Sequence, residues 1–464
     1  MKSFRSAAFA AVILLCFALP TTAQDLLIEN IGPGGDVIIV EQGAIAYRGP
    51  ASDAPPFEGS DRVNAGGAFI TPGLIDMHVH IWGEAELAAY LAHGVTAVRN
   101  LSGMPFHLRM AAEIEAGTLE GPHLFTSGPI LNSPGPNAQI NHVIVASADE
   151  VREAVRAQHA AGYTRVKLYS NLTGEAFQAA LDEAQALGMM VTGHPVEGAR
   201  EEGIPLERDF LVSISETLAA GFETIEHTES IAFHGLRSQV DREAARELIG
   251  ELAASGTPVT PTLVAHRNLV RVAESDGAYA QRPGTEWLNP VTQATETENI
   301  AAWAARDPAY EAERAQFYSW MTGTMHLSGV TLVAGSDAGI FTNIPGDALL
   351  DELELLVEAG LTPAEALASA TSTAARVLGE EGRLGCLESG CLADAVFYAC
   401  PPTENIGCLR QAVALLRGGR WYDAEGLAQL KQRAAQHDID RILDDLLEGM
   451  EAQGTPLDPA ALGL

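Results

Sequence analysis

Beyond residue 19 the sequence contains no long apolar run, and it is poor in basic residues throughout. Lysine and arginine together number 28 against 61 aspartates and glutamates, which gives a formal net charge of -33. A surface of this sign repels phosphate backbones, so nucleic acid is not an expected partner. A membrane-spanning helix needs about 20 apolar residues, so no integral span is expected in the mature chain.

The first residues are typical of an export signal. Lys2 and Arg5 precede an apolar run, Ala7–Leu19, and small residues follow at Thr21–Ala23. The run is short for a bilayer span, so we expect cleavage after about Ala23 and a secreted or periplasmic protein. An uncleaved membrane anchor is the alternative.

Cysteine is scarce and clustered. Cys16 would leave with the signal, and the other four lie in one short stretch, at Cys386, Cys391, Cys400 and Cys408. None of their spacings is C-x2-C and the expected compartment is oxidising, so disulfides are favoured over a zinc site. Four cysteines allow three pairings, and the sequence does not choose among them.

Short apolar runs broken by glycine, proline and aspartate mark both ends of the chain. They predict strands in residues 24–70 and again in 380–425, after a signal at 1–23. Each set is too small to close a core alone, so we expect one composite β-sandwich built from both. The barrel described next is expected at 71–379, and a helical tail at 426–464.

The middle region alternates strand-like and helix-like segments eight times. This pattern predicts an α/β fold, a parallel (β/α)8 TIM barrel. An open doubly wound sheet is the alternative, but no Gly-rich phosphate loop is present. A long insertion before the last strand either covers the barrel mouth or forms a subunit contact. The expected strands are Gly73–His80, Gly94–Asn100, His123–Ile130, Arg165–Ser170, Met189–His194, Thr224–Thr228, Pro258–Val264 and Thr331–Asp337.

Polar side chains share one face of two predicted strands. Because strand side chains alternate, Asp76, His78 and His80 lie on the same face of the first strand. Lys167 and Tyr169 face inward on the fourth strand by the same rule. Two imidazoles at this spacing can converge on one ion. A buried lysine either pairs with an acid or is kept neutral by desolvation, and a neutral lysine can add CO2 to become a carbamate ligand.

Two histidines and an aspartate end later strands. His194 ends the fifth strand, His227 the sixth, and Asp337 the eighth, inside the small-residue run Gly335–Gly339. Each has an ordinary interpretation by itself, as a hydrogen-bonded core histidine or a helix-capping aspartate. Together they lie where barrel enzymes place their active sites, so the sequence predicts a metal centre there.

Five segments also carry a family resemblance. They are Thr71–His80, Gly94–Arg99, Ile225–His227, Gly335–Gly339 and Ala366–Val396. They resemble the amidohydrolase superfamily, in particular its imidazolonepropionase-like and Xaa-Pro-dipeptidase-like branch. The resemblance covers nearly all of the mature chain except the insertion and the tail.

The resemblance implies two divalent metal ions, with zinc favoured and manganese or cobalt compatible with the same ligands. Asp337 would also act as the general base on the attacking water. The implied ligands are His78, His80 and Asp337 for one metal, His194 and His227 for the other, and carboxylated Lys167 as the bridge between them.

The expected reaction is hydrolysis of an amide bond in a small molecule, such as a dipeptide or an N-acyl amino acid. Tyr169, His142 and His266 are candidate substrate contacts. The alternatives are a mononuclear deaminase or cyclic-amidine hydrolase, in which Lys167 is unmodified, and a non-catalytic exported binding protein. Association into a homo-oligomer stays open.

Overall fold

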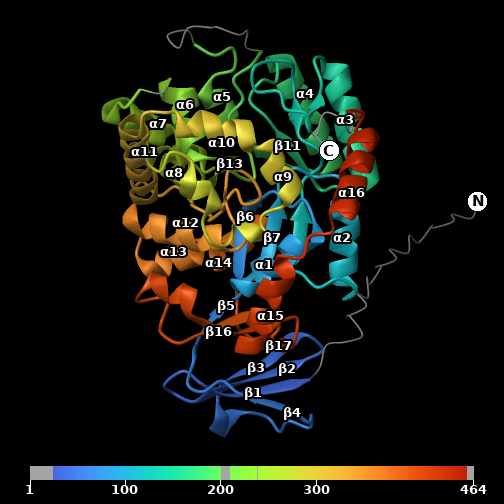
Figure 1. The fold of residues 1–464 in the computed structure, drawn as a ribbon, viewed down its shortest axis with the longest axis vertical. Coiled ribbons are helices and arrows are strands. Elements are labelled where there is room, and N and C mark those ends of the chain that lie inside the picture. Colours follow the sequence, from blue (N-terminus) through green and yellow to red (C-terminus); the bar gives the residue numbers. More distant parts are fainter. Residues whose placement is uncertain (1–24, 200–208, 238, 457–464) are drawn as a thin grey trace, which may run out of the picture.

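The computed structural model describes residues 25–199, 209–237 and 239–456. These residues form a mixed α/β fold with parallel sheets (Figure 1). The expected signal peptide lies outside them. Within the described part of the chain, no helix is both long enough and apolar enough to cross a membrane.

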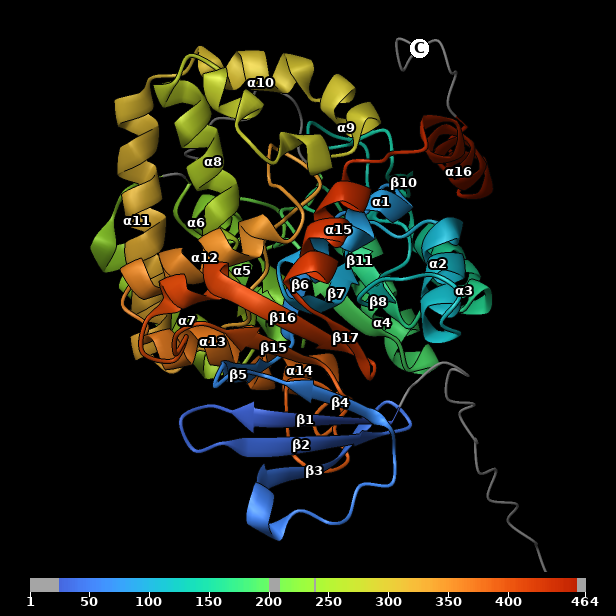
Figure 2. The same ribbon diagram turned by 60° about the horizontal axis from the view of Figure 1, so that its bottom comes forward.

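Two four-stranded sheets draw on both ends of the chain (Figure 2). The first has the strand order β3-β2-β1-β4 and the second β17-β16-β15-β5. Isoleucines and leucines of the first sheet share a buried apolar cluster with Phe397 and Leu416 of the second. The bounds are β1 Leu26–Ile31, β2 Asp36–Glu41, β3 Ala44–Pro50, β4 Asp61–Asn64, β5 Phe69–Pro72, β15 Ala395–Tyr398, β16 Ala412–Arg417 and β17 Arg420–Tyr422.

The central strands are parallel. One sheet has the order β6-β7-β8 and the other β10-β9-β11-β12-β13-β14. Seven of the eight predicted segments contain one of these strands, whereas β9 and β10, in the loop after the third segment, were not predicted. The bounds are β6 Leu74–Val79, β7 Val95–Asn100, β8 His123–Thr126, β9 Leu131–Asn132, β10 Val143–Ile144, β11 Arg165–Leu168, β12 Met190–Gly193, β13 Ile225–Glu226 and β14 Val259–Thr260.

The predicted eighth strand, residues 331–337, makes only single bridges to its neighbours. Leu332 bridges Val259 of β14, and Ala338 bridges Val79 of β6. The regular ladder is interrupted because the Ser336 amide donates to Oδ1 of Asp76 at 3.0 Å. The chain then leaves the extended conformation.

Helices cover the outside of the parallel strands. The predicted insertion forms α8 to α11, and both views place α9 and α10 at the end opposite β1–β4 (Figures 1 and 2). The bounds are α1 Glu84–Ala92, α2 Pro105–Glu115, α3 Ala148–Ala161, α4 Gly174–Leu187, α5 Ile214–Ala219, α6 Thr228–Leu236, α7 Arg242–Ser255, α8 Leu263–Glu274, α9 Pro290–Thr295, α10 Thr297–Ala304, α11 Pro308–Leu327, α12 Asp347–Glu358, α13 Pro363–Ser369, α14 Ser372–Leu378, α15 Ala424–Ala434 and α16 Ile439–Ala452.

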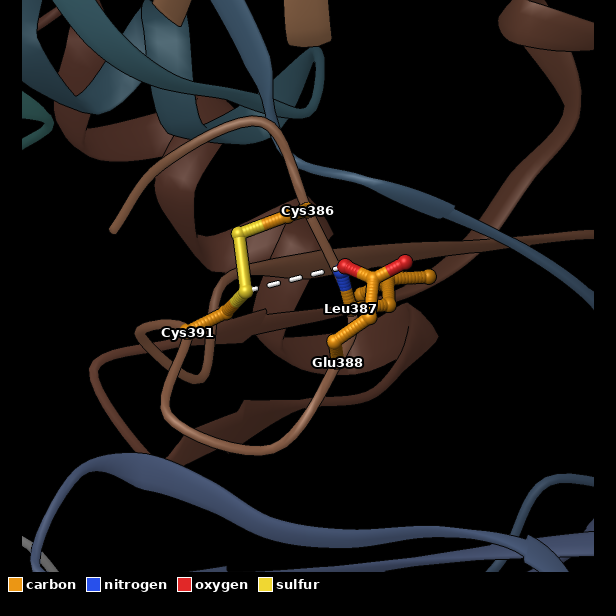
Figure 3. Close-up of a disulfide and its surroundings, with 4 residues drawn as sticks. All are labelled: Cys386, Leu387, Glu388 and Cys391. Atoms are coloured by element: carbon orange, nitrogen blue, oxygen red, sulfur yellow. Dashed lines mark hydrogen bonds between the residues drawn. A yellow bond between two sulfur atoms is a disulfide. The ribbon is translucent and has the colours of Figure 1, made fainter. Parts of the chain in front are cut away.

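The four clustered cysteines form two short-range disulfides, Cys386–Cys391 and Cys400–Cys408. Glu388 lies beside the first (Figure 3), with one carboxylate oxygen 3.8 Å from the sulfur of Cys391. A disulfide sulfur carries no hydrogen, so this is a contact without a donor. Because both thiolates are consumed, this Cys-Glu-Cys group does not offer a metal site.

We expect no free thiol among these four cysteines. The exported protein, unfolded without reductant, should leave a thiol reagent essentially unconsumed, and mass spectrometry of its digest should find the two pairs above. Reduction before titration is the positive control, and it should expose four thiols. Reactive thiols in the unreduced sample, or links between the two pairs, would contradict this assignment.

Candidate metal centre

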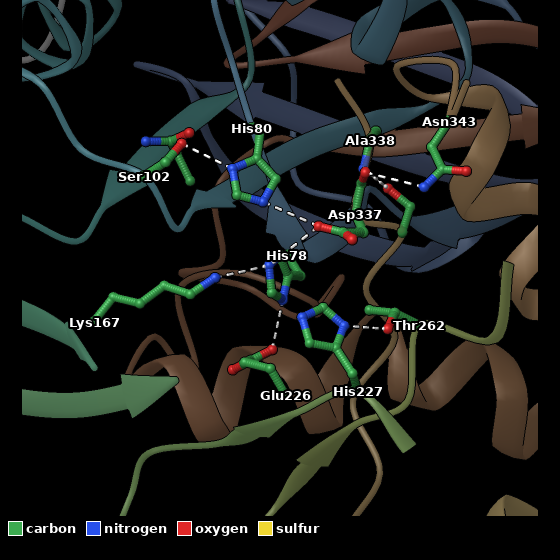
Figure 4. Close-up of polar contacts among 12 residues, drawn as sticks. His78, His80, Ser102, Lys167, Glu226, His227, Thr262, Asp337, Ala338 and Asn343 are labelled. Carbon is green, nitrogen blue, oxygen red and sulfur yellow. Dashed lines mark hydrogen bonds and ion pairs between the residues drawn. The ribbon is translucent and has the colours of Figure 1, made fainter. Parts of the chain in front are cut away.

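The candidate ligands come from several parallel strands, and Figure 4 shows His78, His80, Lys167, His227 and Asp337 close together. Lys167 in β11 is in register with Thr192 of β12, so His194 lies one step further along the same face. The rings of His78 and His194 each lie 4.6 Å, centroid to centroid, from the ring of His227. The remaining two are His80, directly after β6, and Asp337, at the end of the bridged segment.

The tautomers of two of the histidines follow from the hydrogen-bond partners of their Nδ1 atoms. Nδ1 of His78 lies 2.7 Å from a carboxylate oxygen of Glu226, which only accepts, so this nitrogen carries the hydrogen. Nδ1 of His227 lies 2.6 Å from the hydroxyl of Thr262, and that hydroxyl donates its own hydrogen to the Pro261 carbonyl. In both rings Nε2 therefore keeps its lone pair, as in a metal-binding histidine.

These lone pairs face a carboxylate. Nε2 of His78 lies 3.3 Å from Oδ1 of Asp337, and ligand atoms of His78, His227 and Asp337 all lie within 4.8 Å of one another. Electron pairs this close repel unless a cation or proton lies among them, and the three side chains are buried away from water. The donor set therefore fits a divalent metal.

Asp337 also approaches His80, whose Nε2 lies 3.0 Å from the same carboxylate oxygen. The other nitrogen of His80 lies 2.8 Å from the hydroxyl of Ser102. Burial raises the pKa of Asp337, but His78, the contact with His80, and His227 lower it more. The net effect places the pKa of Asp337 below its ordinary range, so this carboxylate is ionised at neutral pH.

Lys167 is buried within the same group, with 1% of its surface exposed. Its Nζ lies 3.1 Å from Nε2 of His78. Burial and the nearby charge of Arg99 lower the pKa of Lys167, whereas the charges of Glu226 and Asp337 raise it. The net result is a pKa of about 8. A lysine with such a pKa is partly a neutral amine at neutral pH, the form that reacts with CO2.

A buried charge network supports His78 from below. Glu226 accepts hydrogen bonds from Arg99 at 3.1 Å, from the Thr192 hydroxyl at 2.8 Å and from the Thr224 hydroxyl. Arg99 also donates to Glu223 at 2.8 Å. The carboxylate that orients His78 is therefore itself held by three donors, as is usual behind metal-binding histidines.

A cavity of about 640 Å³ opens over this group. Residues of α10 and α11, both in the insertion, form part of its wall. Aromatic side chains contribute much of the wall, and Arg306, Glu311 and Arg314 add charge. The aromatic wall residues are Trp82, Tyr169, Phe233, Trp303, Tyr310, Tyr318 and Phe341.

All three predicted substrate contacts lie on the cavity wall. Nδ1 of His142 accepts from the Gln139 amide at 3.3 Å, so Nε2 carries a hydrogen, and it is buried with no partner among the described residues. The ring of Tyr169 packs between His142 and His194, at 4.6 and 4.1 Å. His266 differs, because its Nε2 contacts the Glu311 carbonyl at 3.4 Å and its ring packs against Tyr318 of α11.

Comparison with known proteins identifies the family, because the profile of the amidohydrolase family matches residues 69–421. The chain belongs to the amidohydrolase family. It is 24% identical to imidazolonepropionase of Cupriavidus taiwanensis over 409 residues, 84% of this chain and 91% of that one. It is 22% identical to ochratoxinase of Aspergillus niger over 461 residues, 84% of this chain and 83% of that one.

A solved Xaa-Pro dipeptidase shares the fold with a TM-score of 0.65 at 22% identity, covering 86% of this chain and 100% of that one. The resemblance to the imidazolonepropionase and Xaa-Pro-dipeptidase branch is thereby confirmed. Membership of the amidohydrolase family supports hydrolysis of carbon–nitrogen bonds as the activity.

Sequence reasoning missed Glu226, although it directly precedes His227. Alternation would place the two on opposite faces. His227 instead has a φ of 67°, which ends the extended conformation and turns its ring toward the same centre. The signal in the sequence was its position directly beside His227, within the segment Ile225–His227.

Glu226→Gln should weaken metal binding about 10–100-fold, because an amide holds the His78 tautomer less firmly than a carboxylate does. Competition against a chromophoric chelator measures this. Glu223→Gln is the matched control, since Glu223 bonds to Arg99 and Arg165 but to no histidine. Both variants should lower the melting temperature, and only the first should alter metal affinity. Equal metal affinity in the two variants would refute the orienting role.

Proposed function

We propose that this amidohydrolase is an exported, metal-dependent enzyme that hydrolyses an amide bond in a small molecule. The observation that carries the proposal is the buried convergence of His78, His227 and Asp337, whose electron pairs face one another. Such an arrangement is stable with a cation at its centre. Two disulfides are consistent with the oxidising compartment that the proposed export signal would supply.

We further propose that the parallel strands form a (β/α)8 barrel. The amide of Gly128, after β8, donates to the Arg165 carbonyl in β11 at 2.8 Å, which joins the two parallel sheets. The amide of Met77 in β6 donates to the Ala334 carbonyl at 2.9 Å, and that of Val259 in β14 donates to Thr331 at 2.9 Å. These contacts support the proposed barrel and, with the shared apolar cluster, a composite sandwich beneath it.

The proposed centre is binuclear. Four histidines contribute no charge, so two divalent cations in a buried site require negative ligands. Asp337 supplies one, and a carbamate on Lys167 would supply another where a bare ammonium would repel both ions. Bound divalent cations would polarise the scissile carbonyl and lower the pKa of a water molecule. The nitrogen and oxygen donors suit zinc.

The chain's own residues then divide the remaining work. Asp337, ionised and facing the histidines, would take a proton from the attacking water and deliver it to the leaving amine. The Nε2 hydrogen of His142 would donate to an oxygen of the substrate. Tyr169 would hold His142 in place through ring contact.

The cavity supports a substrate larger than a free amino acid. Its volume of about 640 Å³ and its aromatic wall suit an apolar or aromatic group on one side of the amide. The relatives bear the names imidazolonepropionase, ochratoxinase and Xaa-Pro dipeptidase. We therefore propose N-acyl amino acids and dipeptides with a bulky apolar side chain as the substrate class.

A screen of metal-loaded enzyme tests the proposal most directly. Dipeptides, N-acyl amino acids, cyclic amides and lactones should be compared, together with the metal content of each preparation. Two ions per chain with amide turnover would support the proposal. One ion with deamination would favour the mononuclear alternative, and no turnover of any amide would overturn the proposal.

Asp337→Asn should retain metal yet lose about 10²–10⁴ in kcat, because proton transfer to the leaving amine is lost. Initial rates and metal analysis of the purified variant measure this. Glu311→Gln serves as the control, since it removes another carboxylate from the cavity wall without touching a histidine ligand. Glu311→Gln should change KM more than kcat. Wild-type kcat in Asp337→Asn would eliminate the base assignment.

Lys167→Ala should bind fewer metal ions and lose activity, because the proposed carbamate bridge is absent. A short carboxylic acid such as propionate, added to the variant, should partly restore both. Metal reconstitution of wild-type apoprotein should also depend on bicarbonate. A bare amine at Lys167 in crystals that contain two metal ions would show that the bridge is wrong.

A further inference from the structure

The loop that contains Asp337 is held in an unusual backbone conformation. Asp337, Phe341 and Thr342 have φ values of 54°, 50° and 70°, a region that residues other than glycine rarely adopt. Such strain persists only where surrounding contacts impose it. The contacts that hold this loop therefore also determine where the Asp337 carboxylate lies.

Asn343 makes the contacts that close the loop (Figure 4). Its side-chain NH2 donates to the backbone carbonyl of Asp337 at 3.1 Å, and its backbone carbonyl accepts from the Gly339 amide at 3.0 Å. Its side-chain oxygen accepts from the NH2 group of Asn268, in α8, at 2.8 Å. Both asparagines are fully buried, so water does not replace these bonds.

Residues outside the site determine which way the side-chain amides of Asn268 and Asn343 are oriented. Arg271, one turn further along α8, has only donors, and its guanidinium lies 3.4 Å from Oδ1 of Asn268. The Tyr279 hydroxyl accepts from Arg271 at 2.8 Å and donates to the same Oδ1 at 2.9 Å. Oδ1 of Asn268 is therefore an acceptor, which leaves its NH2 to point at Asn343.

The orientation of Asn268 in turn determines that of Asn343. Because Asn268 donates to the oxygen of Asn343, the NH2 of Asn343 is directed at the Asp337 carbonyl. Reversing either amide would place two oxygens against each other in a buried site.

We infer that Asn268 and Asn343 are positioning residues. Hydrogen-bond donation by Arg271 and Tyr279 sets the orientation of the Asn268 amide, which sets that of Asn343, and Asn343 then holds the backbone of Asp337, the proposed general base. This inference rests on the proposed role of Asp337. Neither asparagine contacts the reacting atoms. The insertion, which begins with α8 and lines part of the cavity, thereby also sets the geometry of the base.

Asn268→Asp is the sharpest test, because it keeps the shape and the acceptor toward Arg271 but removes the donor toward Asn343. The Asn343 amide should then reverse and turn its oxygen on the Asp337 carbonyl. A displacement of about 1 Å at a catalytic group is enough to lower a rate up to about 100-fold. We expect kcat to fall 10–100-fold, with KM within about twofold of wild type and metal content unchanged.

Tyr279→Phe is the matched control. It removes one donor to Asn268 but leaves Arg271, so the direction of the amides persists and kcat should stay within about twofold of wild type. Asn268→Ala covers the case in which Asn268→Asp does not fold. It removes the donor without adding charge, and kcat should fall while KM does not change.

Amide hydrogen exchange of the peptide spanning residues 336–344 gives a readout independent of activity. Exchange there should accelerate in both Asn268 variants and stay unchanged in Tyr279→Phe. Suppose that the wild type cleaves amides. An unchanged kcat in a folded Asn268 variant would then overturn the inference, whether or not its melting temperature is lower. Absence of amide turnover in the wild type would instead count against the proposed function, and unchanged exchange in the Asn268 variants would then overturn the positioning role as well.

Discussion

The structure depends on one electrostatic constraint. Nε2 of His78 lies 3.3 Å from the carboxylate of Asp337, and ligand atoms of His78, His227 and Asp337 lie within 4.8 Å of one another on side chains that are almost fully buried. Without a cation at their centre, these groups would repel one another. Neighbouring side chains hold these groups in place. Glu226 and Thr262 fix the two tautomers, and Ser102 contacts the outer nitrogen of His80.

A chain of charged side chains supports the histidines. Outside the histidines lie Glu226, Arg99 and Glu223, a buried sequence of alternating charges. Removing one member of such a network leaves the others uncompensated, which is why buried ion pairs are costly to break. The network therefore couples the geometry of the site to the stability of the strands.

The sequence was informative wherever strict alternation holds. His78 and His80 share a face of β6, and Lys167 and Tyr169 share a face at β11, as their spacing predicts. Most parallel strands were also predictable, because their apolar runs are bounded by glycine and by helix-forming segments.

Prediction failed wherever the backbone leaves the extended region. Glu226 was missed because the φ of His227 breaks the alternation. The eighth strand was predicted as regular, yet the Ser336 amide donates to the side chain of Asp76 in β6 instead of to a backbone carbonyl of that strand. Asn343 and Asn268 lie about 75 residues apart, and no local pattern links an amide in one helix to a loop that distant. Disulfide pairing was open for the same reason, since it depends on which thiols the fold brings together.

The pairing of β5 with β15 has a consequence for biosynthesis. β15 lies between β5 and β16, so β5 has no partner in its sheet until residues near 395 have been made. Roughly 320 residues separate the two strands. At about 5–20 residues per second, translation leaves the start of the chain without that partner for roughly 15–65 s. Strands β1–β4 can pair early, because all four lie before residue 65, but the apolar cluster that the two sheets share cannot close until β15 and β16 have been made.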